Sequence, residues 1–379
     1  MLYWLLVHVL QRYVPAFRVF GYITTRVALA SLTAMALALA LGPWMIRKLR
    51  ELSFGQHIRE EGPQSHYKKA GTPTMGGLLI VTAIVIPTLL WGDLRNQYLW
   101  LALLGLLCFG AIGFIDDYAK VTKKSNLGLT AWEKFLSQVF CAMVIGFFLL
   151  LLHANQGPYS TAINFPFFKQ FKPDLLIEPF TKNFWTYPLA YVFFYLFIVF
   201  VMVGSSNSVN LTDGLDGLAI GLMIIASGAM TVLTYVSSHA AFSQYLDLAR
   251  LPKSQELTIF CATMVGACLG FLWYNCHPAQ VFMGDVGSLA LGGGLGIVAV
   301  LIKQEILLIF IGGIYVIEAL SVILQVGSYK LRNGKRIFKM APIHHHFEAL
   351  GWPESKVIVR FWIVGFVMAL FALTTLKLR

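Results

Sequence analysis

Long apolar runs alternate with short polar segments along the whole chain. A bilayer core about 30 Å thick needs roughly 20 apolar residues for each helical crossing, and each run is close to that length. The pattern therefore predicts an all-α fold, a polytopic integral membrane protein with about ten transmembrane helices that form a single domain over residues 1–379. The predicted crossings lie at residues 22–45, 73–92, 98–116, 132–153, 186–204, 218–236, 257–274, 286–302, 306–327 and 357–377.

Residues 1–21 precede the first crossing and mix apolar with polar positions. They lack the basic start and the small-residue cleavage site of a signal peptide. We therefore expect them to stay in the protein as an amphipathic segment at the membrane interface. An even number of crossings places both termini on the same side of the membrane.

The distribution of basic residues predicts the orientation of the helices. Lys and Arg are denser in one set of alternate loops than in the other set and the two tails, and loops rich in these residues face the cytoplasm. Both termini and the long 154–185 loop are therefore predicted to be periplasmic. The predicted cytoplasmic loops, which we expect to form a candidate active site, are residues 46–72, 117–131, 205–217, 275–285 and 328–356.

Composition supports a membrane protein, because 58% of the residues are hydrophobic and only 12% are charged. A net charge of +11 is compatible with nucleic-acid binding. The basic residues, however, lie in loops between apolar runs rather than on one soluble face. We expect the lipid bilayer and phosphorylated substrates as partners, and no nucleic acid. The five cysteines form no CxxC pair, so no disulfide framework is predicted.

Five aspartates fall on the predicted cytoplasmic side, at or near the ends of crossings. Asp116 and Asp117 stand in GFIDDYAK, Asp213 and Asp216 in NSVNLTDGLDGLA, and Asp285 in VFMGDVGS. Each one alone is compatible with a solvated loop or a helix cap. Together they are hard oxygen ligands at one membrane face, and such ligands suit Mg²⁺, which also binds substrate phosphates. The sequence therefore predicts a magnesium cofactor.

Helical spacing gives these acids different surroundings. Asp116 and Lys120 share one helix face, whereas Asp117 is rotated by about 100° from Asp116. The adjacent pair is therefore expected to divide its work between a metal or phosphate contact and a second role such as proton acceptance.

The second acidic segment predicts a ligand-binding face. Asn210, Asp213 and Asp216 form a three-residue ladder if the segment is helical. Gly214 and Gly217 leave room for a ligand to approach the backbone.

Two further motifs carry polar groups on the predicted cytoplasmic side. The segment AGTPTMGG, preceded by Lys68 and Lys69, resembles a helix N-terminus that attracts anions. An ordinary helix start with Pro and Gly would have the same sequence pattern. The motif MAPIHHHFE contains His344, His345 and His346. Contiguous side chains do not readily reach one metal, so phosphate binding or proton transfer is favoured over zinc, with a structural cluster as the alternative.

The motifs TPTMGG, GFIDDY, NLTDGLDGLA, FMGDVGSLALGG and APIHHHFE occur in this order. Together they resemble the polyprenyl-phosphate N-acetylhexosamine-1-phosphate transferases, and within them the muramoyl-pentapeptide branch. The resemblance implies a ten-helix, magnesium-dependent enzyme, often a homodimer, in the bacterial inner membrane. It implies transfer of phospho-MurNAc-pentapeptide from UDP-MurNAc-pentapeptide to undecaprenyl phosphate at the cytoplasmic face, which gives lipid I and UMP.

The resemblance also implies roles for particular residues. The implied catalytic residues are Asp116, Asp117, Asp285, His344, His345 and His346. We place the metal on Asp285 and Asp117, and take Asp116 as the leading candidate base. The implied substrate-binding residues are Lys69, Thr74, Lys120, Asn210, Asp213, Gly214, Leu215, Asp216, Asn275 and Phe282. Phe282 is expected to stack on the uracil of the donor.

Three alternatives remain open at this point. A sister enzyme that uses UDP-GlcNAc would share the acids, and APIHHHFE favours the muramoyl-pentapeptide branch. A transporter predicts acids at helix midpoints, where only Glu318 plainly lies. A covalent phospho-aspartyl intermediate is chemically possible. Direct attack is favoured, because the acceptor phosphate already carries a nucleophilic oxygen.

Overall fold

The computed structural model describes residues 1–52, 71–122, 128–154, 159–168, 170–182, 185–246, 248 and 250–377. Within this part of the chain the structure is mainly helical, with an isolated antiparallel bridge between Ala162 and Asp174. Nine of the described helices are long and apolar enough to cross a membrane. These findings confirm the prediction of an all-α polytopic membrane protein.

Every predicted crossing is helical. The corresponding helices are α2 (Ile23–Glu51), α3 (Gly77–Trp91), α4 (Gln97–Thr122), α5 (Ala131–Ala154), α8 (Val192–Thr212), α9 (Leu218–Ser238), α11 (Gln255–Asn275), α12 (Gly284–Leu301), the consecutive pair α13 (Glu305–Ile311) and α14 (Gly313–Leu331), and α16 (Glu354–Thr374). The shorter helices are α1 (Leu2–Trp4), α6 (Glu178–Thr181), α7 (Tyr187–Ala190), α10 (Ala240–Tyr245) and α15 (Ile343–Ala349). Helix α3 is apolar but has only 15 residues.

The predicted loop boundaries were wrong at several helix ends. Helices α2, α4, α8 and α14 continue into the segments predicted as loops 46–72, 117–131, 205–217 and 328–356, and α12 begins inside 275–285. Apolar content marks only the part of a helix that crosses the bilayer core, whereas backbone hydrogen bonds continue beyond it. The functional acids of α4 and α12 therefore stand on helices rather than on loops.

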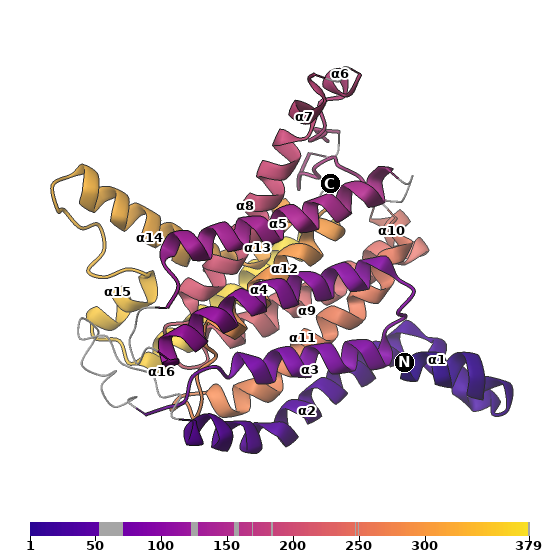
Figure 1. The fold of residues 1–379 in the computed structure, drawn as a ribbon, viewed down its shortest axis with the longest axis horizontal. Helices are drawn as coiled ribbons and strands as arrows, with labels where there is room; N and C mark the ends of the chain where they lie inside the picture. The colour runs from indigo at the N-terminus through magenta and orange to yellow at the C-terminus, as the bar shows by residue number, and fades with distance from the viewer. Residues whose placement is uncertain are drawn as a thin grey trace.

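The run predicted as one crossing at 306–327 is divided at Gly312. Helix α13 ends there and α14 begins at Gly313. Two consecutive glycines weaken the helix at this point because glycine has a low helix propensity. Figure 1 shows that α14 then points away from the other helices, with α15 on the same side of the bundle.

Helix α12 lies at the centre of the bundle. It is the most buried of the candidate spans, and it packs mainly against α4 and α8. Glycines permit the close approach, because a Cβ at Gly113 of α4 would overlap the backbone of Asp285. Figure 1 shows the N and C labels toward the side of the bundle that lies away from α15.

Candidate active site

Three carboxylates meet where α4 packs against the start of α12. Asp116 and Asp117 lie in the last two turns of α4, and Asp285 is the second residue of α12. One oxygen from each side chain lies within 4.8 Å of the others. Asp116 and Asp117 are each only 3% exposed. A cluster of three largely dehydrated carboxylates requires positive charge nearby.

Two lysines supply that charge. Lys120 Nζ lies 2.6 Å from Asp116 Oδ2, 2.8 Å from Asp285 Oδ2 and 3.5 Å from Asp117 Oδ1. The predicted common face of Asp116 and Lys120 is therefore confirmed. Lys134, near the start of α5, lies 2.9 Å from Asp285 Oδ2. Sequence reasoning did not assign Lys134 to the site, because nothing local indicates that α5 approaches α12.

Backbone groups fix the two carboxylates of α4 in different ways. The amide of Leu129 donates to Asp116 Oδ1 at 2.7 Å, and the amide of Val286 donates to Asp117 Oδ2 at 3.1 Å. Adjacent residues on one helix thus have different partners, as the helical geometry predicted. Asp117 is tied to α12, whereas Asp116 is tied to the segment before α5.

The predicted ladder of Asn210, Asp213 and Asp216 was wrong. Helix α8 ends at Thr212, and Asp213 has the non-helical dihedral angles φ −78° and ψ 51°. Asn210 therefore faces α12, where its Nδ2 atom donates to Asp285 Oδ1 at 2.6 Å and to Ser288 Oγ at 2.8 Å. Ser288 is a further site residue that sequence reasoning missed.

Asp213 is the first residue after α8 and begins the 213–217 loop. Burial, together with the smaller effects of the charges of Asp285, Asp117 and Asp216, raises the pKa of Asp213 to about 8. The side chain retains some exposed surface.

Asp216 belongs to a second group, with His277 and Glu354, that sequence reasoning missed. Asp216 Oδ2 lies 3.1 Å from His277 Nδ1 and accepts a hydrogen bond from the amide of Ala279 at 3.1 Å. Glu354 Oε1 accepts a hydrogen bond from the Asp216 amide at 3.0 Å. The spacing of these three residues would also permit a metal ion. The contacts join the 213–217 loop to the segment after α11 and to the start of α16.

Asn275 reinforces the same connection. Its Oδ1 atom accepts a hydrogen bond from the Gly217 amide at 3.1 Å, and its Nδ2 atom donates to the Val281 carbonyl at 2.9 Å. The residue is 2% exposed. Both the oxygen and the nitrogen of its side-chain amide thus form hydrogen bonds within the protein. Its role in substrate binding stays a prediction.

The TPTMGG segment is paired with the FMGD segment through the backbone. The amide of Phe282 donates to the Pro73 carbonyl, and the amides of Gly76 and Gly77 donate to the carbonyls of Phe282 and Met283. The amides of Gly76 and Gly77 are therefore occupied by protein carbonyls and do not bind an anion here. Lys69 lies outside the described residues, as does Lys68.

Thr74 lies close to the acidic site, on the other side of Gly284 from Asp117. Gly284 has a positive φ of 70°, and a Cβ there would lie 2.5 Å from Asp117 Oδ2 and 3.0 Å from Thr74 Oγ1. Only glycine satisfies both the backbone conformation and the space. Phe282, two residues earlier, is half-buried, and Leu215 on the 213–217 loop is buried.

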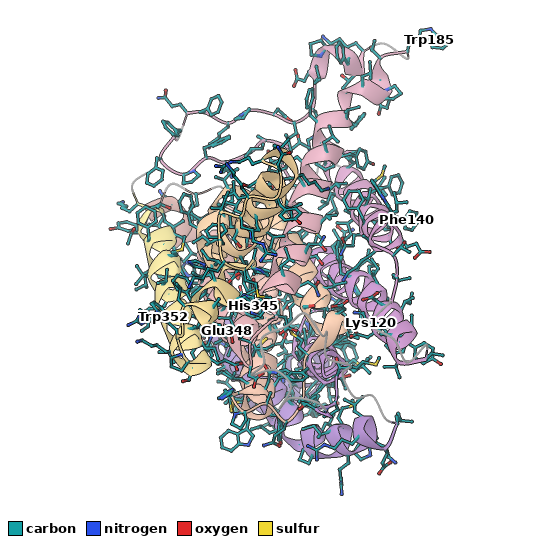
Figure 2. The ribbon with its side chains drawn as sticks, turned by 90° about the vertical axis from the view of Figure 1, so that its left-hand side faces the viewer. Lys120, Phe140, Trp185, His345, Glu348 and Trp352 are labelled. Carbon is teal, nitrogen blue, oxygen red and sulfur yellow. The ribbon has the colours of Figure 1, made fainter. Side chains whose placement is uncertain are left out.

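The three contiguous histidines have three different environments. His344 is fully buried and lies 3.1 Å from Glu318 of α14. His345 is partly exposed and lies 2.7 Å from Glu348, and His346 Nδ1 accepts a hydrogen bond from the Lys339 amide at 3.1 Å. Figure 2 faces this end of the bundle and shows Lys120 and His345 within its outline, with Trp185 far away at the tip near α6 and α7.

Comparison with known proteins agrees with the motifs. The profile of Glycosyl transferase family 4 matches residues 99–303, and the phospho-N-acetylmuramoyl-pentapeptide-transferase signature 1 matches residues 69–81. Proteins named phospho-N-acetylmuramoyl-pentapeptide-transferase are 66% identical over 379 residues in Solibacter usitatus, 62% over 379 in Acidobacterium capsulatum and 61% over 386 in Koribacter versatilis. Each match covers 100% of both chains. The chain belongs to the phospho-N-acetylmuramoyl-pentapeptide-transferase family.

The matches with this transferase family cover most of the acidic site. The range 99–303 contains the three carboxylates, both lysines and Asn210, and the signature contains Thr74. The histidine motif and Glu354 lie beyond that range, and the full-length relatives cover them. The family assignment therefore rests on the whole chain rather than on one motif.

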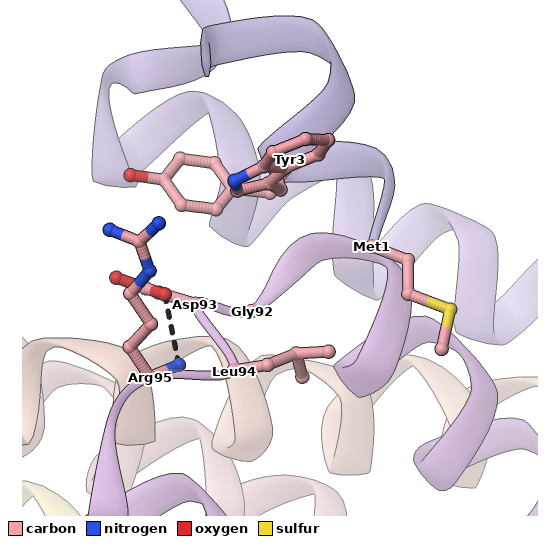
Figure 3. Close-up of a pocket in the computed structure, with 7 residues that line it drawn as sticks. Met1, Tyr3, Gly92, Asp93, Leu94 and Arg95 are labelled. Carbon is pink, nitrogen blue, oxygen red and sulfur yellow. Dashed lines mark hydrogen bonds between the residues drawn. The ribbon is translucent and has the colours of Figure 1, made fainter. Parts of the chain in front are cut away.

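A cavity of about 360 Å³ lies away from this site. It is lined by Met1, Tyr3, Trp4, Gly92, Asp93, Leu94 and Arg95. Figure 3 shows Tyr3 above Asp93 and Arg95, and the Arg95 amide donates to Asp93 Oδ1. Arg95 precedes the start of α4, whereas Asp116 lies near its end. The cavity and the acidic site are therefore separated by most of the length of this helix.

Proposed function

We propose that this chain transfers phospho-MurNAc-pentapeptide from UDP-MurNAc-pentapeptide to undecaprenyl phosphate in the bacterial inner membrane, giving lipid I and UMP. Full-length relatives named for this transferase support the choice of donor. The main structural support is that three carboxylates and two lysines from α4, α5 and α12 meet at one end of the bundle. We place this site at the cytoplasmic face and propose a homodimer, as the resemblance implies.

We propose Mg²⁺ as the cofactor, held by Asp117 and Asp285. The residues fit this ion, because the three side chains offer only carboxylate oxygens within 4.8 Å of one another. Lys120 Nζ contacts all three carboxylates, so a positive charge is stabilised at this point. When bound, Mg²⁺ would neutralise the donor diphosphate and polarise the phosphorus under attack.

Both substrates are anionic, so charge neutralisation comes first. Among the described residues, Lys134 and Lys120 are the cations of the site, and they lower the repulsion between the donor diphosphate and the acceptor phosphate. Both are partly buried, with side-chain exposures of 18% and 33%. Their charges therefore act in a partly dehydrated environment, where they are stronger than in water.

An oxygen of the acceptor phosphate then attacks the sugar-linked phosphorus of the donor. The bond between this phosphorus and the bridging oxygen breaks, and UMP leaves with that oxygen. Asp116 stays the proposed base for any proton on the acceptor phosphate. In this structure its Oδ1 accepts a hydrogen bond from the Leu129 amide and its Oδ2 pairs with Lys120. Phosphorylated enzyme formed from donor alone would contradict this direct route.

The decisive experiment uses the full chain in detergent, where no sealed compartment exists. The purified protein should release UMP and form the lipid product from UDP-MurNAc-pentapeptide and undecaprenyl phosphate. UDP-GlcNAc, tested in parallel, should give no product. Product from UDP-GlcNAc alone would assign the chain to the sister reaction, and no product from either donor would reject the proposed function.

A further inference from the structure

A buried carboxylate and a buried imidazole meet between α14 and α15. Glu318, in α14, and His344, in α15, are both 0% exposed. Glu318 Oε2 lies 3.1 Å from His344 Nδ1, which is within ion-pair distance but is not aligned as a hydrogen bond. The same oxygen accepts a hydrogen bond from the His344 backbone amide at 3.5 Å. Glu318 lies within a membrane-spanning helix, where an ionisable side chain is costly unless it has a partner or a function.

The other edge of the His344 ring packs against the 213–217 loop. A Cβ at Gly214 would overlap His344 Nε2, and the three nearest atoms to that position all belong to the His344 ring. Gly214 does not have a positive φ, so the backbone itself would accept alanine. The imidazole, rather than the backbone conformation, is what excludes a side chain from position 214.

This arrangement separates His344 from the other two histidines. His345 and His346 retain exposed surface, whereas His344 has none and lies behind the loop that carries Asp213 and Asp216. A side chain without exposed surface does not contact a substrate that enters from solvent. The catalytic role implied for His344 by the resemblance therefore does not follow from this geometry.

We propose that Glu318 and His344 are positioning residues for the donor. Glu318 holds His344 through its backbone amide and lies against its imidazole. The imidazole in turn supports the 213–217 loop, whose backbone and acids contact the nucleoside. A carboxylate commonly sets the orientation of a functional histidine in this way. The inference rests on the proposed function, since it assumes that the 213–217 loop binds the UDP part of the donor.

Binding without turnover tests this proposal. The affinities of UMP and of UDP-MurNAc-pentapeptide are measured on the full chain in the absence of acceptor. We expect Glu318→Gln and His344→Gln to weaken both by about 10- to 100-fold, the range found when an outer partner of a functional histidine is removed. Ser321→Ala is the matched control, because it removes a hydrogen bond to the Glu318 carbonyl one turn along α14, and it should leave both affinities unchanged.

The pH profile of turnover gives a second readout. Positioning residues should lower the rate without changing the shape of the profile. Unchanged UMP affinity combined with the loss of one limb of the profile would overturn the proposal and assign proton transfer to His344. If wild-type protein binds UMP but forms no lipid product, the proposed function fails while the comparison of affinities still decides the role of the pair.

A double substitution keeps the proposal testable if His344→Gln does not fold. Gly214→Ala should weaken UMP binding in the wild-type background, because the new methyl group displaces the imidazole. In the His344→Ala background the same substitution should change the affinity by less than about twofold, since the overlapping atoms are gone. Equal losses in both backgrounds would show that His344 does not act through position 214.

Discussion

Lys134 Nζ lies 2.9 Å from Asp285 Oδ2, so that α5 and α12 meet in one ion pair across a separation of 151 residues in the sequence. The same lysine lies 3.5 Å from Asn210 Oδ1, and Asn210 in turn donates to Asp285. Side chains from α5 and α8 thus both contact the Asp285 carboxylate of α12. This relationship makes Lys134 the site residue that most needs a functional test.

Replacing Lys134 with methionine should reduce kcat by about 10²- to 10³-fold, the range found when one charge-stabilising group is removed from a transition state. Methionine keeps much of the length of lysine but lacks its charge. Lys330→Met, at the exposed end of α14, changes the net charge equally and should have no effect. Initial rates of UMP release measure both, and a Lys134 variant with near-normal kcat would contradict the role in neutralising charge.

Asp285→Asn should abolish nearly all turnover, because a neutral amide is a poorer Mg²⁺ ligand than a carboxylate. Turnover by the wild-type chain should also vanish when EDTA removes the ion and return when Mg²⁺ is added. The control is Glu51→Gln, since the Glu51 side chain is 61% exposed and pairs with Lys48 on the same helix. Normal rates for Asp285→Asn across a Mg²⁺ titration would remove this residue from the proposed metal site.

Phe282→Ala should weaken donor binding by roughly 5- to 150-fold if the ring stacks on uracil, because such stacking contributes about 1–3 kcal/mol. The Mg²⁺ requirement should stay the same. Phe140→Ala is the control, because Phe140 is 69% exposed on α5 and lies at the outer surface of the bundle in Figure 2. Donor Kd and melting temperature are measured together. A lower melting temperature with unchanged Kd would mean that Phe282 serves packing alone.

Arg26 and Glu256 form a buried ion pair between α2 and α11, with two contacts of 2.9 Å. Glu256 also accepts a hydrogen bond from the Asp93 amide. Arg26→Met should cost about 3–5 kcal/mol of stability, because it leaves the Glu256 charge buried without its partner. The double variant Arg26→Met/Glu256→Met should regain most of that loss in a melting experiment. Equal melting temperatures for the single and double variants would show that the ion pair does not control stability.

The sequence by itself determined the fold class and the chemical content of the site. Crossings of a bilayer have a fixed length, so apolar runs are sufficient to locate helices. Aspartates in GFIDDYAK and VFMGDVGS are conspicuous in such a chain because ionisable groups near the membrane core are costly. Helical geometry was also sufficient for the Asp116–Lys120 pair, since residues four apart share one face.

The tertiary structure decided which helices are neighbours, and with them the partners of each polar group. Lipid-facing and protein-facing positions of a membrane helix are similarly apolar, so the sequence pattern does not indicate that α5 and α8 both reach Asp285. The end of α8 at Thr212 turned Asp216 toward His277 and Glu354, and the packing of α15 against α14 buried His344 beside Glu318. Each of these contacts joins segments far apart in the chain, and only the packed bundle brings them within reach.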